Sequence, residues 1–182
     1  MHGPASPGWL LVALCAAAGA YCLLRLRSRV EEQRRTAGAE ALMAFGMAAM
    51  AVPATVFTPP GWAWPGYAAV FGGAALHTLR AGRAGRRHLH HLVGDAAMVY
   101  MAVAMAASPS GHAHGGTGVP VLTGALLLYF TGYVLLSGIR LVPVSGVSAI
   151  PAGALAWGDR PELVRACRLS MGIAMVAMLL TL

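Results

Sequence analysis

The sequence is poor in charge. Only 10% of its 182 residues are charged, against about 25% in ordinary soluble domains, and it contains no lysine. In contrast, 58% of the residues are hydrophobic and the mean hydropathy is +0.66. These values exclude a water-soluble globular domain and indicate a chain that is solvated by lipid. We therefore expect an integral membrane protein.

Cysteines and catalytic motifs are also scarce. Cys15, Cys22 and Cys167 cannot form an even set of disulfides, and all three fall in or beside apolar segments. The chain has no Walker loop, no GxSxG, no HExxH and no convincing CxxC motif, so the sequence gives no support for an enzyme. The net charge of +7 comes from arginines that lie between apolar stretches, not in a patch with aromatic residues, which argues against nucleic acid as a partner.

Apolar stretches of about the length of a bilayer span occur six times. The segments 58–61 and 108–111, rich in proline, glycine and serine, are typical of the loops between such spans. We expect one all-α transmembrane domain over residues 1–182, folded as a bundle of six helices. Residues 140–162 are expected to form a cytoplasmic interfacial or re-entrant loop. The expected spans are residues 9–26, 39–57, 64–79, 91–107, 119–139 and 163–182.

The arginines predict the orientation of this bundle. All thirteen lie in the first, third and fifth connections or their flanks, and none lies in the tails or in the second and fourth connections. Because arginine-rich loops stay in the cytoplasm, both termini are expected outside. Trp9, Trp62 and Trp64 would then lie at the outer membrane interface, where amphipathic rings are favoured.

Methionine is the unusual residue of this chain. Nine methionines follow the initiator, and all nine fall in the second, fourth and sixth expected spans. They recur at steps of three and four residues, which places them on one face of each helix, next to a charged residue at its inner end. The three stripes are Glu40, Met43, Met47 and Met50; Arg168, Met171, Met175 and Met178; and His88, His91, Asp95, Met98, Ala102 and Met105, with Met101 beside the last.

The orientation predicts that these three helices all run outward, so equal offsets from the inner end mean similar depth. If their stripes face one another, Glu40, Asp95 and Arg168 form one charged layer with layers of methionine above it. Thioether ligands select Cu(I), and stacked neutral layers allow a monovalent cation to move between sites. We therefore expect a protein that binds or conducts Cu(I). The expected metal-site residues are Glu40, Met43, Met47, Met50, His88, His91, Asp95, Met98, Met105, Met171, Met175 and Met178.

Other interpretations of the same residues stay open. Methionine is also a flexible filler of apolar cores, and a buried ion triad can lock helices together without further function. A b-type haem needs two histidines on facing helices, for which His77 and either His88 or His91 are candidates. His112 and His114 form an HxH pair that could capture a metal weakly or be merely solvated. A structural or partner-binding subunit without ligand is the remaining alternative.

Two resemblances accompany these motifs. The MxxxM spacing at Met43/Met47 and Met171/Met175 is similar to the methionine filter of the Ctr copper channels, in which three helices each contribute one methionine per layer. The segments 40–43, 91–98 and 167–175 resemble an uncharacterised actinobacterial family of multispanning membrane proteins, labelled domain of unknown function 5134. That resemblance implies a bacterial inner (plasma) membrane and brings no activity. The expected partner is the lipid bilayer, with a metallochaperone or a second copy of the chain as candidates.

Overall fold

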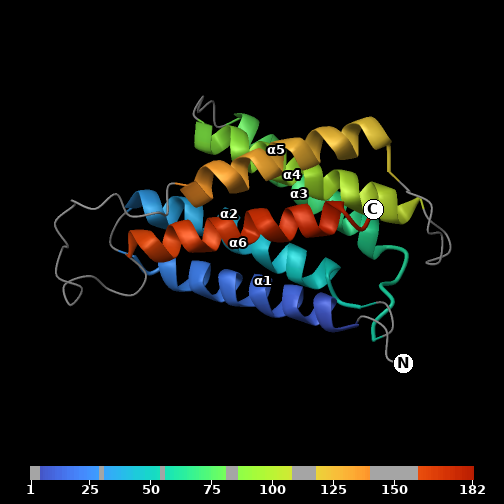
Figure 1. Cartoon of the computed structure of the whole chain (residues 1–182), viewed down its shortest axis with the longest axis horizontal. Helices are drawn as coiled ribbons and strands as arrows, with labels where there is room; N and C mark the ends of the chain where they lie inside the picture. Colours follow the sequence, from blue (N-terminus) through green and yellow to red (C-terminus); the bar gives the residue numbers. More distant parts are fainter. Residues whose placement is uncertain (1–4, 29–30, 54–55, 81–85, 108–117, 140–159) are drawn as a thin grey trace. The chain divides into compact units, whose positions relative to one another are not determined.

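The computed structural model describes residues 5–28, 31–53, 56–80, 86–107, 118–139 and 160–182. These parts contain helices and no strand, which confirms the all-α prediction for the described residues (Figure 1). Six helices account for nearly all of them. Their bounds are α1 Ala5–Arg25, α2 Glu31–Met50, α3 Ala63–Arg80, α4 Arg86–Ala106, α5 Pro120–Ile139 and α6 Pro161–Leu179.

Proline marks the beginning of several helices. Pro120 and Pro161 are the first residues of α5 and α6, and Pro7 and Pro65 lie in the first turns of α1 and α3. The first N–H groups of a helix have no partner within it, so proline loses nothing there and its fixed φ suits the helix. Glu162 adds a favourable negative charge to the first turn of α6.

The second helix is the one whose predicted bounds were wrong. It was expected over residues 39–57, but α2 begins at Glu31 and ends at Met50. Its charged first turns continue the helix beyond the apolar stretch, and Pro53 disfavours helical geometry in the residue before it. The other five helices begin and end within five residues of the predicted spans.

Three of the described helices are long and apolar enough to cross a membrane: Pro7–Arg25, Leu89–Ala106 and Pro120–Ile139. A shorter apolar helix covers Thr36–Met50. On α5, Val121 and Leu128 are 82% and 79% exposed, although both are large apolar side chains. Such surfaces are suited to lipid and not to water, so the chain has the character of a membrane protein.

The chain divides into two compact units. Unit 1 comprises Met1–Val52 and Leu128–Ala177, and unit 2 comprises Pro53–Leu127 and Met178–Leu182. Unit 1 therefore holds α1, α2, the second half of α5 and most of α6, whereas unit 2 holds α3, α4 and the first half of α5. That residues 1–182 form one domain stays a prediction. Residues 140–159, His2, His112 and His114 lie outside the described part of the chain, as does the side chain of His88.

Close approaches between helices shape unit 1. A Cβ atom at Gly19 of α1 would come within 2.9 Å of the Phe45 ring of α2. A Cβ atom at Gly172 of α6 would come within 2.9 Å of Val134 of α5. Figure 1 shows that α1 runs opposite to α2, while α6 runs in the same direction as α2. Glycine thus allows neighbouring helices of this unit to pack closely.

In unit 2, α3 packs against α4, and α4 is tied to the beginning of α5. The Tyr100 hydroxyl lies 2.6 Å from the hydroxyl of Thr123 and donates to the Val119 carbonyl at 3.3 Å. Gly118 leaves the space for this hydroxyl, since a Cβ atom there would lie 2.2 Å from it.

Candidate functional site

The three helices of unit 1 that meet at Glu40 carry matching stripes of buried residues. On α1 the stripe consists of Cys15, Ala18, Cys22 and Arg25, all of them buried, at steps of three, four and three residues. The same steps run from Glu40 along α2 and from Arg168 along α6. Equal steps near a 3.5-residue period keep one face of each helix turned toward its neighbours over several turns.

Glu40 is the centre of a buried ion cluster, in which it is only 1% exposed. Arg25 of α1 is buried to the same extent and forms an ion pair with Oε2 of Glu40. Arg168 of α6 donates from Nε to Oε1 of Glu40 at 2.8 Å, and its Nη2 forms an ion pair with the same oxygen at 2.7 Å. The Cys22 thiol of α1 also donates to Oε2, at 3.8 Å. We call these four residues the Glu40 cluster.

The Glu40 cluster carries more positive than negative charge. Two guanidinium groups share one carboxylate, so the cluster holds one net positive charge when Glu40 is ionised. The Nε atom of Arg25 is buried and has no hydrogen-bond partner among the described residues. Removing charges from water is costly unless each one is paired and hydrogen-bonded. The cluster can therefore accept one further negative charge favourably.

A second thiol lies beside the Cys22 thiol of this cluster. Cys22 is fully buried on α1, and the side chain of Cys167 on α6 is its neighbour. The Cys167 thiol also lies 3.8 Å from the carbonyl oxygen of Ala18. Both cysteines are free thiols. We call Cys22 and Cys167 the thiol pair.

Above the cluster lie buried methionines. The ion pair between Glu40 and Arg168 fixes the register of α2 against α6, and these helices run in the same direction (Figure 1). Residues three and seven positions further along therefore lie about 4.5 and 10.5 Å beyond the ion pair. These are Met43 and Met171, and then Met47 and Met175, which are 7%, 8%, 0% and 1% exposed. We call them the two thioether pairs.

Cys15 adds a third sulfur at the level of the second thioether pair. It is 1% exposed and precedes Cys22 by seven residues on α1. Because α1 runs opposite to α2, seven residues back along α1 and seven residues forward along α2 cover the same distance outward, about 10.5 Å. Unit 1 thus carries buried sulfur atoms on three of its helices, at two matched depths.

Of the predicted metal-site residues, unit 1 contains Glu40 and four buried methionines, and Arg168 of the predicted charged layer pairs with Glu40. Met50 is half-buried at the end of α2. The remaining predicted residues lie in unit 2, so the charged layer with Asp95 and the face-to-face arrangement of three methionine stripes stay predictions. In unit 2 are His91, Asp95, Met98 and Met105 of α4, and Met178 at the end of α6.

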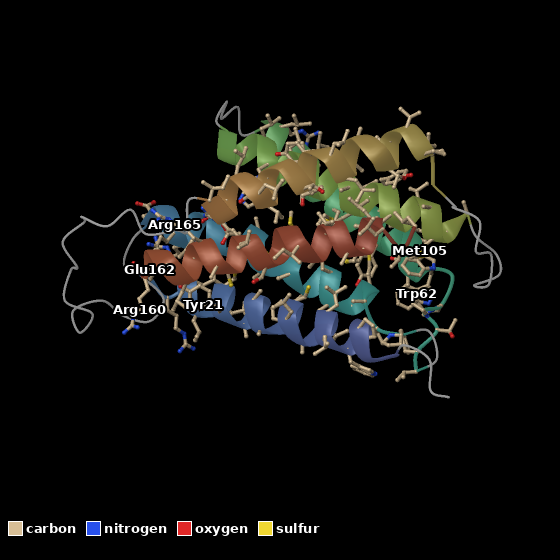
Figure 2. All side chains as sticks on the ribbon, viewed as in Figure 1. Tyr21, Trp62, Met105, Arg160, Glu162 and Arg165 are labelled. Carbon is tan, nitrogen blue, oxygen red and sulfur yellow. The ribbon has the colours of Figure 1, made fainter. Side chains whose placement is uncertain are left out.

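The residues of α4 differ in burial. Asp95 and Met98 are buried, whereas Met105 is 37% exposed and departs from the buried stripe. Figure 2 shows Met105 at the same end of unit 2 as Trp62. His77 is exposed on α3 and His91 is half-buried on α4. A haem between these two histidines stays a prediction.

In the part of the chain that the structure describes, no group of three or more His, Cys, Asp and Glu side chains is placed to hold a metal ion. Methionine thioethers are a different class of ligand. Unit 1 buries four of them, and the thiol pair adds two more soft donor atoms.

Sequence reasoning missed Arg25, Cys15 and Cys22 as parts of the site. Arg25 looked like a loop charge that sets the membrane orientation, and the cysteines looked like leftover apolar residues. The signal was present nonetheless. Cys15, Ala18, Cys22 and Arg25 repeat the same steps as the two methionine stripes, with the charged residue again at the arginine-rich end of the helix.

Comparison with known proteins gives one match. A family model described as "Domain of unknown function (DUF5134)" matches residues 32–182, which include α3 to α6 and all of α2 but its first residue. No curated protein and no solved structure matches the chain.

Proposed function

Because the chain belongs to the DUF5134 family, whose domain has no assigned function, we propose a function from its residues: it is a membrane protein that binds Cu(I) through methionine thioethers. The binding path lies in unit 1 and runs outward from the Glu40 cluster along the two thioether pairs. The observation that carries this proposal is the burial of four methionines at matched depth on two helices joined by the ion pair of Glu40 and Arg168.

The chemistry of the thioether pairs favours a soft monovalent ion. Thioether sulfur is a neutral, polarizable ligand that prefers Cu(I) to the harder divalent ions. A neutral ligand set does not need a counter-charge of its own. Because the pairs follow one another at about one helical turn, an ion can pass from Met43 and Met171 to Met47 and Met175, with Cys15 at the level of the second pair.

The proposal includes the membrane arrangement. The protein has six spans in a bacterial inner membrane, with both termini outside. Unit 1 supports this orientation, because α1 ends and α6 begins at the end where Arg160 and Arg165 lie (Figure 2). In unit 2, α3 ends with Arg80 and α4 begins with Arg86. Arginine-rich ends remain in the cytoplasm, so the Glu40 cluster faces the cytoplasmic end of unit 1.

A Cu(I) competition titration tests the proposal. The full-length protein in detergent is titrated anaerobically against a chromophoric Cu(I) chelator. Replacing Met43 and Met171 together by leucine keeps the apolar volume, at a stability cost usually below about 1.5 kcal/mol per site, but removes two ligands. We expect the double variant to keep its melting temperature within a few degrees and to lose affinity for Cu(I).

The matched control is Met101→Leu. Met101 is as deeply buried as the thioether pairs, at 2% exposed, but lies on α4 in unit 2. This variant should bind Cu(I) as the parent does. If the double variant binds as tightly as the parent, or if the parent binds no Cu(I), the methionines serve packing only.

A further inference from the structure

The thiol pair has no part in the thioether path. Cys22 and Cys167 are free thiols on different helices. The Cys167 thiol lies 3.8 Å from the carbonyl oxygen of Ala18, one turn before Cys22 on α1, and Cys22 donates to Glu40. A structural role would need neither thiol, because small apolar residues would fill the same space. The position of two thiols next to two guanidinium groups therefore suggests a chemical role.

The positive charge of the Glu40 cluster indicates what this chemical role is. Arg25 and Arg168 share Glu40 as their carboxylate partner among the described residues, which leaves one positive charge uncompensated. The Nε–H of Arg25 is a buried donor without an acceptor in the same part of the chain. In a medium of low dielectric constant, a nearby group with a single negative charge would be held favourably.

We propose that Cys22 and Cys167 bind one Cu(I) ion as a two-coordinate bis-thiolate at the cytoplasmic end of unit 1. This proposal rests on the proposed function in taking Cu(I) as the ligand, but it uses different donor atoms. Two thiols each lose a proton and form a bond to Cu(I), so that one Cu(I) is bound and two protons are released. The complex carries one negative charge, which matches the one positive charge left over in the Glu40 cluster.

The charge of the complex also determines which metal ions fit the thiol pair. Ag(I) forms the same complex with one negative charge and is a redox-stable substitute for Cu(I). A divalent ion between two thiolates would be neutral and would leave the cluster with its excess charge. Zn²⁺ also requires about four ligands in a tetrahedron, and the structure offers two thiols at this point. The thiol pair therefore selects soft monovalent ions.

The bis-thiolate site and the thioether pairs differ in their response to protons. Thioethers carry no proton and bind Cu(I) without releasing one. Thiols must be deprotonated, so metal binding competes with protons and strengthens as pH rises. While both thiols are protonated in the free protein, the affinity of the thiol pair rises about 100-fold per pH unit, whereas that of the thioether pairs stays constant.

Proton release during an anaerobic titration tests this inference. The reduced full-length protein is titrated with Ag(I) in weak buffer at pH 6.5, and a pH indicator dye counts the protons. The parent should release two protons with the first equivalent of Ag(I) and bind Zn²⁺ far more weakly. Cys22→Ala and Cys167→Ala should abolish that two-proton step and lower the affinity at least about 100-fold.

Met101→Leu is the matched control, because Met101 is nearly as deeply buried as Cys22 but lies on α4 in unit 2. It should retain the two-proton step. If the first Ag(I) equivalent binds to the parent without proton release, or if Zn²⁺ competes equally with it, the inference is wrong. The proton count comes from the parent protein, so the test stands even if a cysteine variant does not fold.

The two proposals can fail separately. If the parent releases two protons and the variant with leucine at positions 43 and 171 keeps full affinity, the thiol pair binds the metal and the thioether path does not. If Ag(I) and Cu(I) bind without proton release and that leucine variant loses affinity, the thioether path holds and the thiol pair does not. A parent that binds neither ion overturns both.

Discussion

Arg168 donates a hydrogen bond from Nε to one oxygen of Glu40, 128 residues earlier in the chain, and its Nη2 forms an ion pair with the same oxygen. The other oxygen of Glu40 is occupied by Arg25. One carboxylate therefore ties three helices together at one depth. This arrangement sets the register on which the alignment of the methionines depends. Glu40 is therefore the residue whose replacement should destabilise unit 1 most.

Replacing Glu40 by glutamine should strongly destabilise the protein. The variant removes the single negative charge between two guanidinium groups, one of them buried. Leaving a buried charge without its partner typically costs about 3 to 5 kcal/mol. We expect a large drop in the melting temperature of the detergent-solubilised protein. Glu162→Gln is the control, since Glu162 is exposed in the first turn of α6 and should matter by about 1 kcal/mol or less.

The effect of Arg25→Leu on the melting temperature should change sign when Glu40 is also replaced. In the parent, Arg25→Leu removes a buried partner of Glu40 and should lower the melting temperature. In the Glu40→Gln protein, the same change removes a buried charge that has lost its partner, so it should raise the melting temperature. A double-mutant cycle measures this coupling. Additive effects would show that Arg25 and Glu40 do not act as a pair.

Replacing Gly172 by alanine should loosen the contact between α6 and α5. The new Cβ atom would approach Val134 to 2.9 Å and Tyr133 to 3.4 Å, and the β-branched Val134 has little freedom to move away. Overpacking of this kind typically costs about 1 to 3 kcal/mol.

Gly132→Ala on α5 is the control for that variant, because a Cβ atom there meets no neighbour within 4 Å. In an open position of a helix, alanine is favoured over glycine by up to about 1 kcal/mol. The two glycine variants should therefore shift the melting temperature in opposite directions. Equal shifts would contradict the close packing at Gly172.

Much of this structure follows from local patterns in the sequence. Long apolar runs separated by proline and glycine predict the helices, and the three-four-three steps from Glu40 and Arg168 predict which side chains are buried. The end of α2 was misplaced because the apolar run continues past Pro53, while the backbone cannot continue its helix there.

The partners of each stripe were harder to predict. Helical periodicity identifies a buried face but does not say which other helix covers it. Methionine content singled out α2, α4 and α6. In unit 1, however, the ion cluster is completed by α1, which contains no methionine. That α1 packs against α2 depends on the charge of Arg25 and on the close approach at Gly19. Neither feature can be recognised from amino-acid composition.

The membrane orientation gives the last prediction. In a variant with the three native cysteines replaced by alanine, a single cysteine is introduced at Gly61, before α3, or at Glu31, the first residue of α2. Both positions are exposed, and both leave the arginine distribution unchanged. Because arginine-rich ends remain in the cytoplasm, an impermeant thiol reagent added to intact cells should label the cysteine at Gly61 and not the one at Glu31. Permeabilised cells should label both, which shows that each thiol is reactive. Labelling at Glu31 in intact cells would reverse the orientation and place the Glu40 cluster and its thiol pair at the outer face.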